Sequence, residues 1–118
     1  MGMSLIVVEA TIVLTDPGRR DEAVTASVPW QQATRDDEPG CLAYCFAADP
    51  VQPDTIQVYE LWADAESLDA HFLHPNYLAM RDLLGRIGLK SALARKLRVD
   101  ATAPVYGPGF VPTASFDI

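Results

Sequence analysis

The order in which apolar patterns follow one another constrains the fold of this chain more than any single motif. Four segments have the alternating or β-branched character of strands, and two have the spacing of amphipathic helices. Their order is β-α-β-β-α-β, which predicts the split βαβ unit of a ferredoxin-like α+β fold. We expect an antiparallel sheet with both helices on one face. The expected strands are residues 5–14, 41–47, 55–62 and 92–99.

The alternation in residues 55–62 assigns side chains to the two faces of the sheet. Glu60 and Trp62 share one face, and Tyr59 lies on the other. We expect Tyr44 on the same face as Tyr59. Apolar residues occur on both faces, so both need cover, and a chain of 118 residues has no spare element to supply it. A second copy is the simplest cover, so the sequence predicts a homodimer, a dimeric α+β barrel.

Local signals mark where the two helices begin, bend and end. Asp16 and Asp64 are expected N-caps, because their carboxylates can accept hydrogen bonds from the first turn. Pro29 removes one helical hydrogen bond and predicts a kink in the first helix. Pro75 predicts a kink or a restart in the second helix. Gly88 is expected to end it.

The chain changes character after residue 100. We expect one domain over residues 1–100 and a tail over residues 101–118, where prolines and glycines prevent regular structure. Such a tail is either disordered or packed on the body or on a partner subunit. Its apolar side chains favour packing. They are Val105, Tyr106, Phe110, Val111 and Phe116.

The charge balance excludes several classes of partner. The net charge is −7, and a surface of this sign repels nucleic-acid phosphates. The apolar run in residues 5–8 is too short to span a membrane and lacks the charged start of a signal peptide. We therefore expect a cytoplasmic protein that binds neither nucleic acid nor membrane. Cys41 and Cys45 lie on an expected strand too far apart to bond, so they are either buried thiols or a reactive pair.

Three stretches together resemble the antibiotic biosynthesis monooxygenase family. They are Glu-Pro-Gly-Cys-Leu-Ala-Tyr at residues 38–44, Tyr-Glu-Leu-Trp-Ala-Asp at residues 59–64, and Leu-Asp-Ala-His-Phe at residues 68–72. The resemblance covers roughly residues 5–99 in order and spacing. It implies a dimer whose sheets face each other, with a pocket in each subunit between sheet and helices.

The resemblance also bears on activity. Several members oxidise polycyclic phenols or quinols with molecular oxygen and without metal or flavin, others degrade haem, and many have no known activity. Haem-degrading members carry a Trp at the position of His71, a His near Arg81 and an Asn near Ala10, and this chain departs at all three. His71 instead matches the His of quinol-oxidising and uncharacterised members. We therefore expect no haem.

The candidate catalytic residues are His71 and Glu60. An oxygenase without a cofactor needs a base for the phenol, a dry pocket and groups that stabilise the developing oxyanion. His71 titrates near neutrality and suits the base, although a half-buried structural His is the alternative. Glu60 is a second base if it faces the core. No Gly-rich cofactor loop is present, and His71 with His74 makes only a weak metal pair, so no cofactor is expected.

Five further side chains are candidates for binding a flat substrate. Trp62, Trp30, Phe72 and Tyr77 could contact its rings, or simply pack in the core. Arg81 could hold an anionic oxygen, or pair with Asp82 or another surface acid.

The sequence thus predicts a monooxygenase that uses O2 on an aromatic phenol or quinol. Two alternatives remain open, a dimeric ligand-binding protein of the same fold and a subunit that stabilises a larger assembly through its tail.

Overall fold

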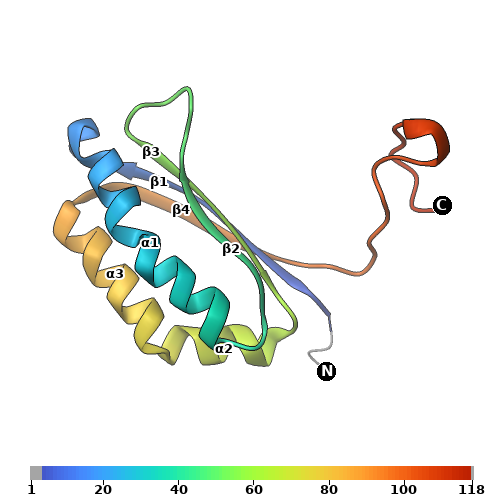
Figure 1. The fold of residues 1–118 in the computed structure, drawn as a ribbon, viewed down its shortest axis with the longest axis horizontal. Coiled ribbons are helices and arrows are strands. Elements are labelled where there is room, and N and C mark those ends of the chain that lie inside the picture. The colour runs from blue at the N-terminus through green and yellow to red at the C-terminus, as the bar shows by residue number, and fades with distance from the viewer. Residues whose placement is uncertain (1–3, 118) are drawn as a thin grey trace.

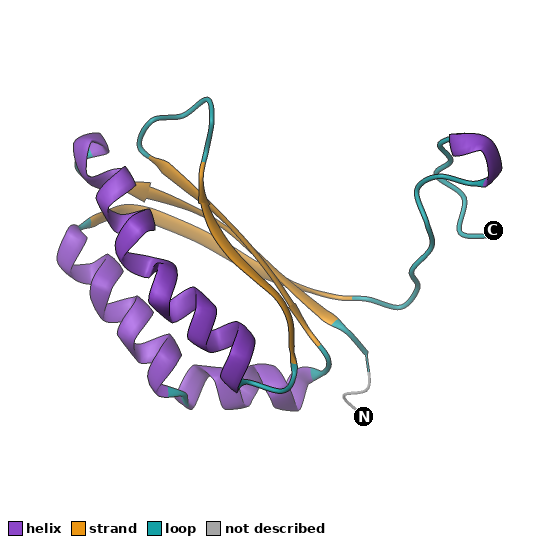
Figure 2. Ribbon diagram, viewed as in Figure 1, coloured by secondary structure: helices purple, strands orange, loops and turns teal. Residues whose placement is uncertain are grey.

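The described chain forms one four-stranded sheet covered on one face by three α-helices (Figures 1 and 2). The structure is a computed structural model and describes residues 4–117. A short 3₁₀ turn, Pro17–Arg19, precedes the first helix. The expected β-α-β-β-α-β order is confirmed, with the second helix divided in two. The elements are β1 Ile6–Leu14, α1 Arg20–Asp37, β2 Cys41–Ala48, β3 Thr55–Trp62, α2 Ala65–Leu73, α3 Pro75–Ile87 and β4 Leu89–Arg98.

The sheet has the strand order β2-β3-β1-β4, and every neighbouring pair is antiparallel. This is the ferredoxin-like α+β arrangement expected from the sequence. The helix-facing side chains of β3, such as Ile56 and Trp62, are buried. On the opposite face Tyr59 and Leu93 are exposed. The sheet of a single chain is therefore open on one side.

The helix boundaries follow the capping signals. Oδ1 of Asp64 accepts a 2.8 Å hydrogen bond from the Ser67 amide, which starts α2. α2 ends at Leu73 and α3 begins at Pro75, so the predicted restart is confirmed. α3 ends at Ile87 and is capped by Gly88, whose φ of 103° lies in the region that favours glycine. Among residues 4–117, no helix has the length and apolar character that a membrane crossing requires.

Pro29 does not divide the first helix. α1 runs without a break from Arg20 to Asp37 and contains Pro29. Tertiary contacts hold the helix on the sheet beyond the proline. The buried amide of Gln31 donates to the Phe46 carbonyl and accepts from the Phe46 amide, both at 3.0 Å. This two-way bond fixes α1 against β2.

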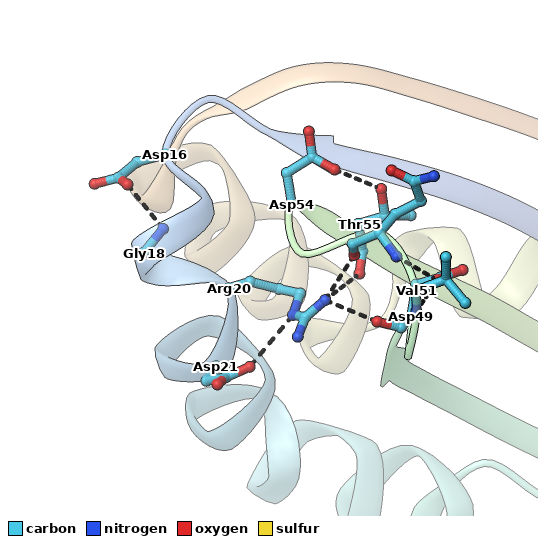
Figure 3. Close-up of polar contacts among 9 residues, drawn as sticks. Asp16, Gly18, Arg20, Asp21, Asp49, Val51, Asp54 and Thr55 are labelled. Carbon is cyan, nitrogen blue, oxygen red and sulfur yellow. Dashed lines mark hydrogen bonds and ion pairs between the residues drawn. The ribbon is translucent and has the colours of Figure 1, made fainter.

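A second anchor joins the start of α1 to the loop between β2 and β3 (Figure 3). Nη1 of Arg20 donates to the carbonyl oxygens of Asp49 and Gln52 at 2.9 and 2.8 Å. Within the loop, Oδ1 of Asp49 accepts from the Val51 amide at 2.8 Å. Asp16 accepts from the Gly18 amide at 2.9 Å, as expected of an N-cap. The guanidinium thus links loop and helix at the end of the sheet away from α2.

Two expectations about β2 are wrong. A register irregularity between Cys41 and Ala43 shifts the alternation, so Tyr44 lies opposite Glu60 and is buried under the helices. Cys45 is exposed, because it lies on the side of the sheet that no helix covers. Cys41 is half-buried, and burial raises the pKa of its thiol to about 11. Both cysteines are free, and Cys41 is not a reactive thiolate near neutral pH.

The last strand has other bounds than expected, and the tail extends away from it. β4 begins at Leu89, earlier than expected, because its first residues pair with the end of β1 beyond a register shift. The tail stands away from the sheet and helices (Figure 1), so it does not pack on its own body. Residues 106–112 of the tail turn back on themselves and form a small hook, in which the Gly107 amide donates to the Val111 carbonyl at 2.9 Å. Phe110, on this hook, is 84% exposed.

Candidate functional site

A cavity of about 280 Å³ lies between the helix-facing side of the sheet and helices α2 and α3. Its walls are mostly apolar, with side chains such as Val8, Ile12, Met80 and Leu84. This composition suits a small organic molecule whose orientation depends on a few polar groups. The polar and ionisable side chains that line it are Tyr44, Glu60, His71, Tyr77 and Arg81.

His71 reaches this space because it shares the inner face of α2 with Leu68. Its ring is almost fully buried, with the Trp62 ring 4.5 Å and the Tyr77 ring 5.3 Å away between centroids. Nδ1 lies 2.8 Å from Oε1 of Glu38. Burial lowers the pKa of His71, and the Glu38 carboxyl only partly opposes this. The imidazole is therefore neutral at pH 7 and able to accept a proton.

Glu60 is the second buried acid–base group of the cavity. It faces the helices from β3, and its Oε1 accepts a 2.9 Å hydrogen bond from Nε1 of Trp62. Burial raises the pKa of Glu60 to about 7. The nearby Glu38 carboxyl raises this pKa further, and the hydrogen bond from Trp62 lowers it. Glu60 is thus divided between its acid and its carboxylate form near neutral pH.

Sequence reasoning missed Glu38 as a site residue and treated it as the start of a turn. The side chain is buried, and its two oxygens are bonded to His71 and to Nδ2 of Asn76, the latter at 3.2 Å. Nδ1 of His74 lies 3.8 Å from Oε2. The Glu-Pro-Gly sequence was the one signal that could have indicated this role. A turn at this position packs on α2, so the side chain of its first residue, Glu38, points toward His71.

Tyr44 is the other residue that sequence reasoning missed. It lines the cavity from β2 and is 2% exposed, with its ring 5.5 Å from that of His71. Burial raises the pKa of its phenol well above the usual range, and the Glu60 and Glu38 carboxyls add to the effect. Tyr44 therefore remains a neutral phenol at every pH at which the protein would be assayed.

The predicted binding residues are only partly brought together. Phe72, Tyr77 and Arg81 line the cavity. Trp62 is fully buried behind His71 and does not line it, and Trp30 lies exposed on α1, away from it. The expected surface pair of Arg81 with Asp82 is wrong, because Asp82 pairs with Arg86 at 2.9 Å.

The two histidines both lie close to the carboxyl group of Glu38. Both direct Nδ1 toward Glu38, and His74 Nδ1 also accepts a 3.0 Å hydrogen bond from the Asn76 amide. Within residues 4–117, no group of three His, Cys, Asp or Glu side chains is arranged to hold a metal ion.

The model of the antibiotic biosynthesis monooxygenase family matches residues 5–83, which is more than half of the chain. The chain belongs to the antibiotic biosynthesis monooxygenase family. The resemblance read from the sequence is thereby confirmed. A relative from Synechocystis sp., an uncharacterised protein, is 28% identical over 71 residues. That match spans 60% of this chain and 48% of the relative.

Solved structures share the family fold. A provisionally named antibiotic biosynthesis monooxygenase from Caulobacter crescentus superposes with a TM-score of 0.75 at 22% identity, over 82% of this chain and 91% of that chain. The protein Rv0793 from Mycobacterium tuberculosis has a TM-score of 0.72 at 22% identity, covering 86% and 100% of the two chains. A conserved protein from Methanosarcina mazei has a TM-score of 0.69 at 23% identity, covering 81% and 93%. At these identities the likeness establishes the fold alone.

Proposed function

We propose that this family member is a cofactor-independent monooxygenase that oxidises a phenol- or quinol-type aromatic molecule with O2. The observation that carries the proposal is the pairing of two buried acid–base groups, His71 and Glu60, in one apolar cavity. Membership of a family named for monooxygenases supports the reaction class. The small apolar cavity supports an aromatic substrate.

The chemistry needs a substrate that supplies its own electrons. Oxygen is in a triplet state, so it reacts with an organic molecule only after one electron has moved, and a phenolate gives an electron more readily than a phenol. A substrate SH2 then reacts as SH2 + O2 → SO + H2O, in which the organic molecule loses four electrons and both hydrogens. One oxygen atom enters the product and the other leaves as water. No further reductant is required.

The proposed roles follow from the positions of the side chains. His71 accepts the phenol proton, and Glu60 is the alternative base. Phe72 and Tyr77 contact the ring from the helix side. Arg81 faces an anionic oxygen of the substrate. Trp62 supports the site from behind, through its contact with His71 and its hydrogen bond to Glu60.

We further propose that two copies assemble through the open face of the sheet. This face is hollowed by a groove of about 610 Å³ over β1, β3 and β4, where Tyr59 and Leu93 are exposed. Exposed apolar groups gathered on one face are costly in water. A second copy that presents the same face covers both at once, as in a symmetric dimer.

An oxygen electrode tests the reaction directly. The purified protein is mixed with a panel of polyphenols and hydroquinones, and the oxygen consumed is compared with the product formed. We expect one O2 per product, and one labelled oxygen atom in the product when 18O2 is used. Binding of these compounds without oxygen uptake would identify a ligand-binding protein instead.

His71→Ala connects the reaction to the site. If His71 is the base, turnover falls by about 10²- to 10⁴-fold, the usual contribution of general-base catalysis. If His71 is only structural, the variant melts at a lower temperature and keeps its turnover per folded molecule. Measuring activity and thermal unfolding on the same sample separates these results. Leu73→Ala is the matched control on the same helix, because Leu73 is exposed and does not line the cavity.

A further inference from the structure

We propose that Glu38 is a positioning residue that keeps the proton of neutral His71 on Nδ1 and presents Nε2, as a proton acceptor, to the cavity. The consequence for turnover rests on the proposed function. The pairing of the two side chains, and the tautomer it sets, do not.

The geometry of the pair supports this assignment. Nδ1 of His71 and Oε1 of Glu38 are 2.8 Å apart, and both side chains are buried. A carboxylate has no proton to give, so the hydrogen of this bond must come from Nδ1. His71 also lines the cavity, and within residues 4–117 its Nε2 forms no hydrogen bond to the protein. Nε2 is therefore the nitrogen left for a bound molecule.

The second oxygen of Glu38 explains why this position suits a carboxylate. Oε2 accepts a 3.2 Å hydrogen bond from Nδ2 of Asn76, so both partners of Glu38 are donors. A glutamine has one acceptor and one donor group at its end. Placed here, it would direct its amide hydrogens at either His71 or Asn76. In the first case the His71 proton must move to Nε2, and the cavity loses its acceptor.

The turn that carries Glu38 is fixed against the helix that carries His71. A Cβ on Gly40 would lie 2.1 Å from Oγ of Ser67, so only glycine permits this close approach to α2. The Ala63 amide donates to the Gly40 carbonyl, and the Cys41 amide donates to the Glu38 carbonyl, both at 2.9 Å. The Glu38 carboxyl is thus held in place by the backbone before any substrate binds.

Nitrogen-15 NMR of the full-length protein reads the tautomer without any substrate. The chain has two histidines, His71 and His74, so a His74→Gln sample assigns the signals. In the wild-type protein we expect the Nδ1–H form for His71. In Glu38→Gln we expect a change to the Nε2–H form or to a mixture. Glu66→Gln is the matched control, because it removes an exposed carboxylate from the first turn of α2 and leaves Glu38 untouched.

A second substitution tests whether the hydrogen-bond acceptor next to His71 sets the tautomer. It also shows whether an effect of Glu38→Gln comes from this bond and not from misfolding. In the double variant Glu38→Gln with Asn76→Asp, residue 76 accepts from the new amide, so the amide oxygen faces His71 again. We expect this variant to regain the Nδ1–H form. An Nε2–H form in the wild-type protein overturns the proposal by itself. Retention of the Nδ1–H form in a folded Glu38→Leu variant, in which residue 38 can neither accept nor donate a side-chain hydrogen bond, also overturns it.

Measurement of turnover tests separately whether Glu38 affects catalysis. We expect Glu38→Gln to lower kcat at least about tenfold with little change in KM, and the double variant to recover part of it. An Nδ1–H tautomer in a protein that consumes no oxygen would reject the proposed function and support the pairing. A changed tautomer with unchanged kcat would reject the positioning role while leaving the oxygenase intact.

Discussion

Nε1 of Trp62 donates a 2.9 Å hydrogen bond to Oε1 of Glu60, which lies two residues earlier on the same face of β3. The fully buried indole therefore serves the site without lining the cavity. This bond favours the charged form of Glu60, but burial disfavours it more strongly and raises the pKa to about 7. An acid that is half ionised at neutral pH affects both stability and activity, and each effect can be measured.

The first prediction concerns the pH dependence of stability. The pKa of Glu60 is about 7 in the folded protein against 4.5 ordinarily, so the folded state binds more protons between these values. The free energy of unfolding therefore falls as pH rises from about 4.5 to about 7, by roughly 3 kcal/mol. Glu60→Gln removes this loss. In urea unfolding, the free energy of unfolding of the variant relative to the wild type should increase from about pH 4.5 to about pH 7. A difference that does not change with pH would contradict the raised pKa of Glu60.

The second prediction identifies the base from the pH dependence of the rate. A base works when deprotonated, so kcat/KM rises with pH through its pKa in the free enzyme. Burial lowers the pKa of His71 below its ordinary 6.5, whereas that of Glu60 is about 7. If kcat/KM rises with a midpoint below pH 6.5 and this rise is kept in Glu60→Gln, His71 is the base. If kcat/KM rises with a midpoint near pH 7 and this rise is lost in Glu60→Gln, Glu60 is the base.

The third prediction concerns the open face of the sheet. Light scattering on a sizing column should give twice the chain mass of 12.9 kDa. Leu93→Asp places a charge on the open face and should shift the protein toward monomer at micromolar concentration. Leu73→Asp is the control, because Leu73 is similarly exposed, at 82% against 77%, but lies on α2. A wild-type monomer, or equal behaviour of the two variants, argues against assembly through this face.

The fourth prediction concerns the tail. Its hook is held by an isolated β-bridge between Tyr106 and Pro112 and by the rings of Tyr106 and Phe110, whose centroids are 6.0 Å apart. The apolar side chains of the hook are nevertheless exposed. We expect the hook to dock on a partner subunit. Deleting residues 101–118 should then raise the dimer dissociation constant, and Phe110→Ser should do so in part. Rapid hydrogen exchange throughout the tail of the intact dimer would show that the hook does not dock.

Sequence reasoning predicted the fold because the relevant signals are local. Alternation in residues 55–62 gave the buried face of β3, and Asp64 and Pro75 marked the starts of α2 and α3. The inward direction of His71 followed from helical spacing with Leu68. Pro29 lies inside α1, and the Gln31 contact with β2 holds the helix on the sheet past the missing hydrogen bond.

The sequence by itself determined the order of the elements and the inward direction of His71, because period and capping act over a few residues, and three short motifs indicated the family. Only the tertiary structure decided that Glu60 faces the helices and what surrounds both groups. Glu38 meets His71 across 33 residues of chain, through a turn that packs on α2. A one-residue irregularity in β2 turned Tyr44 toward the cavity. Contacts between distant segments depend on register and packing, which no local pattern of residues encodes.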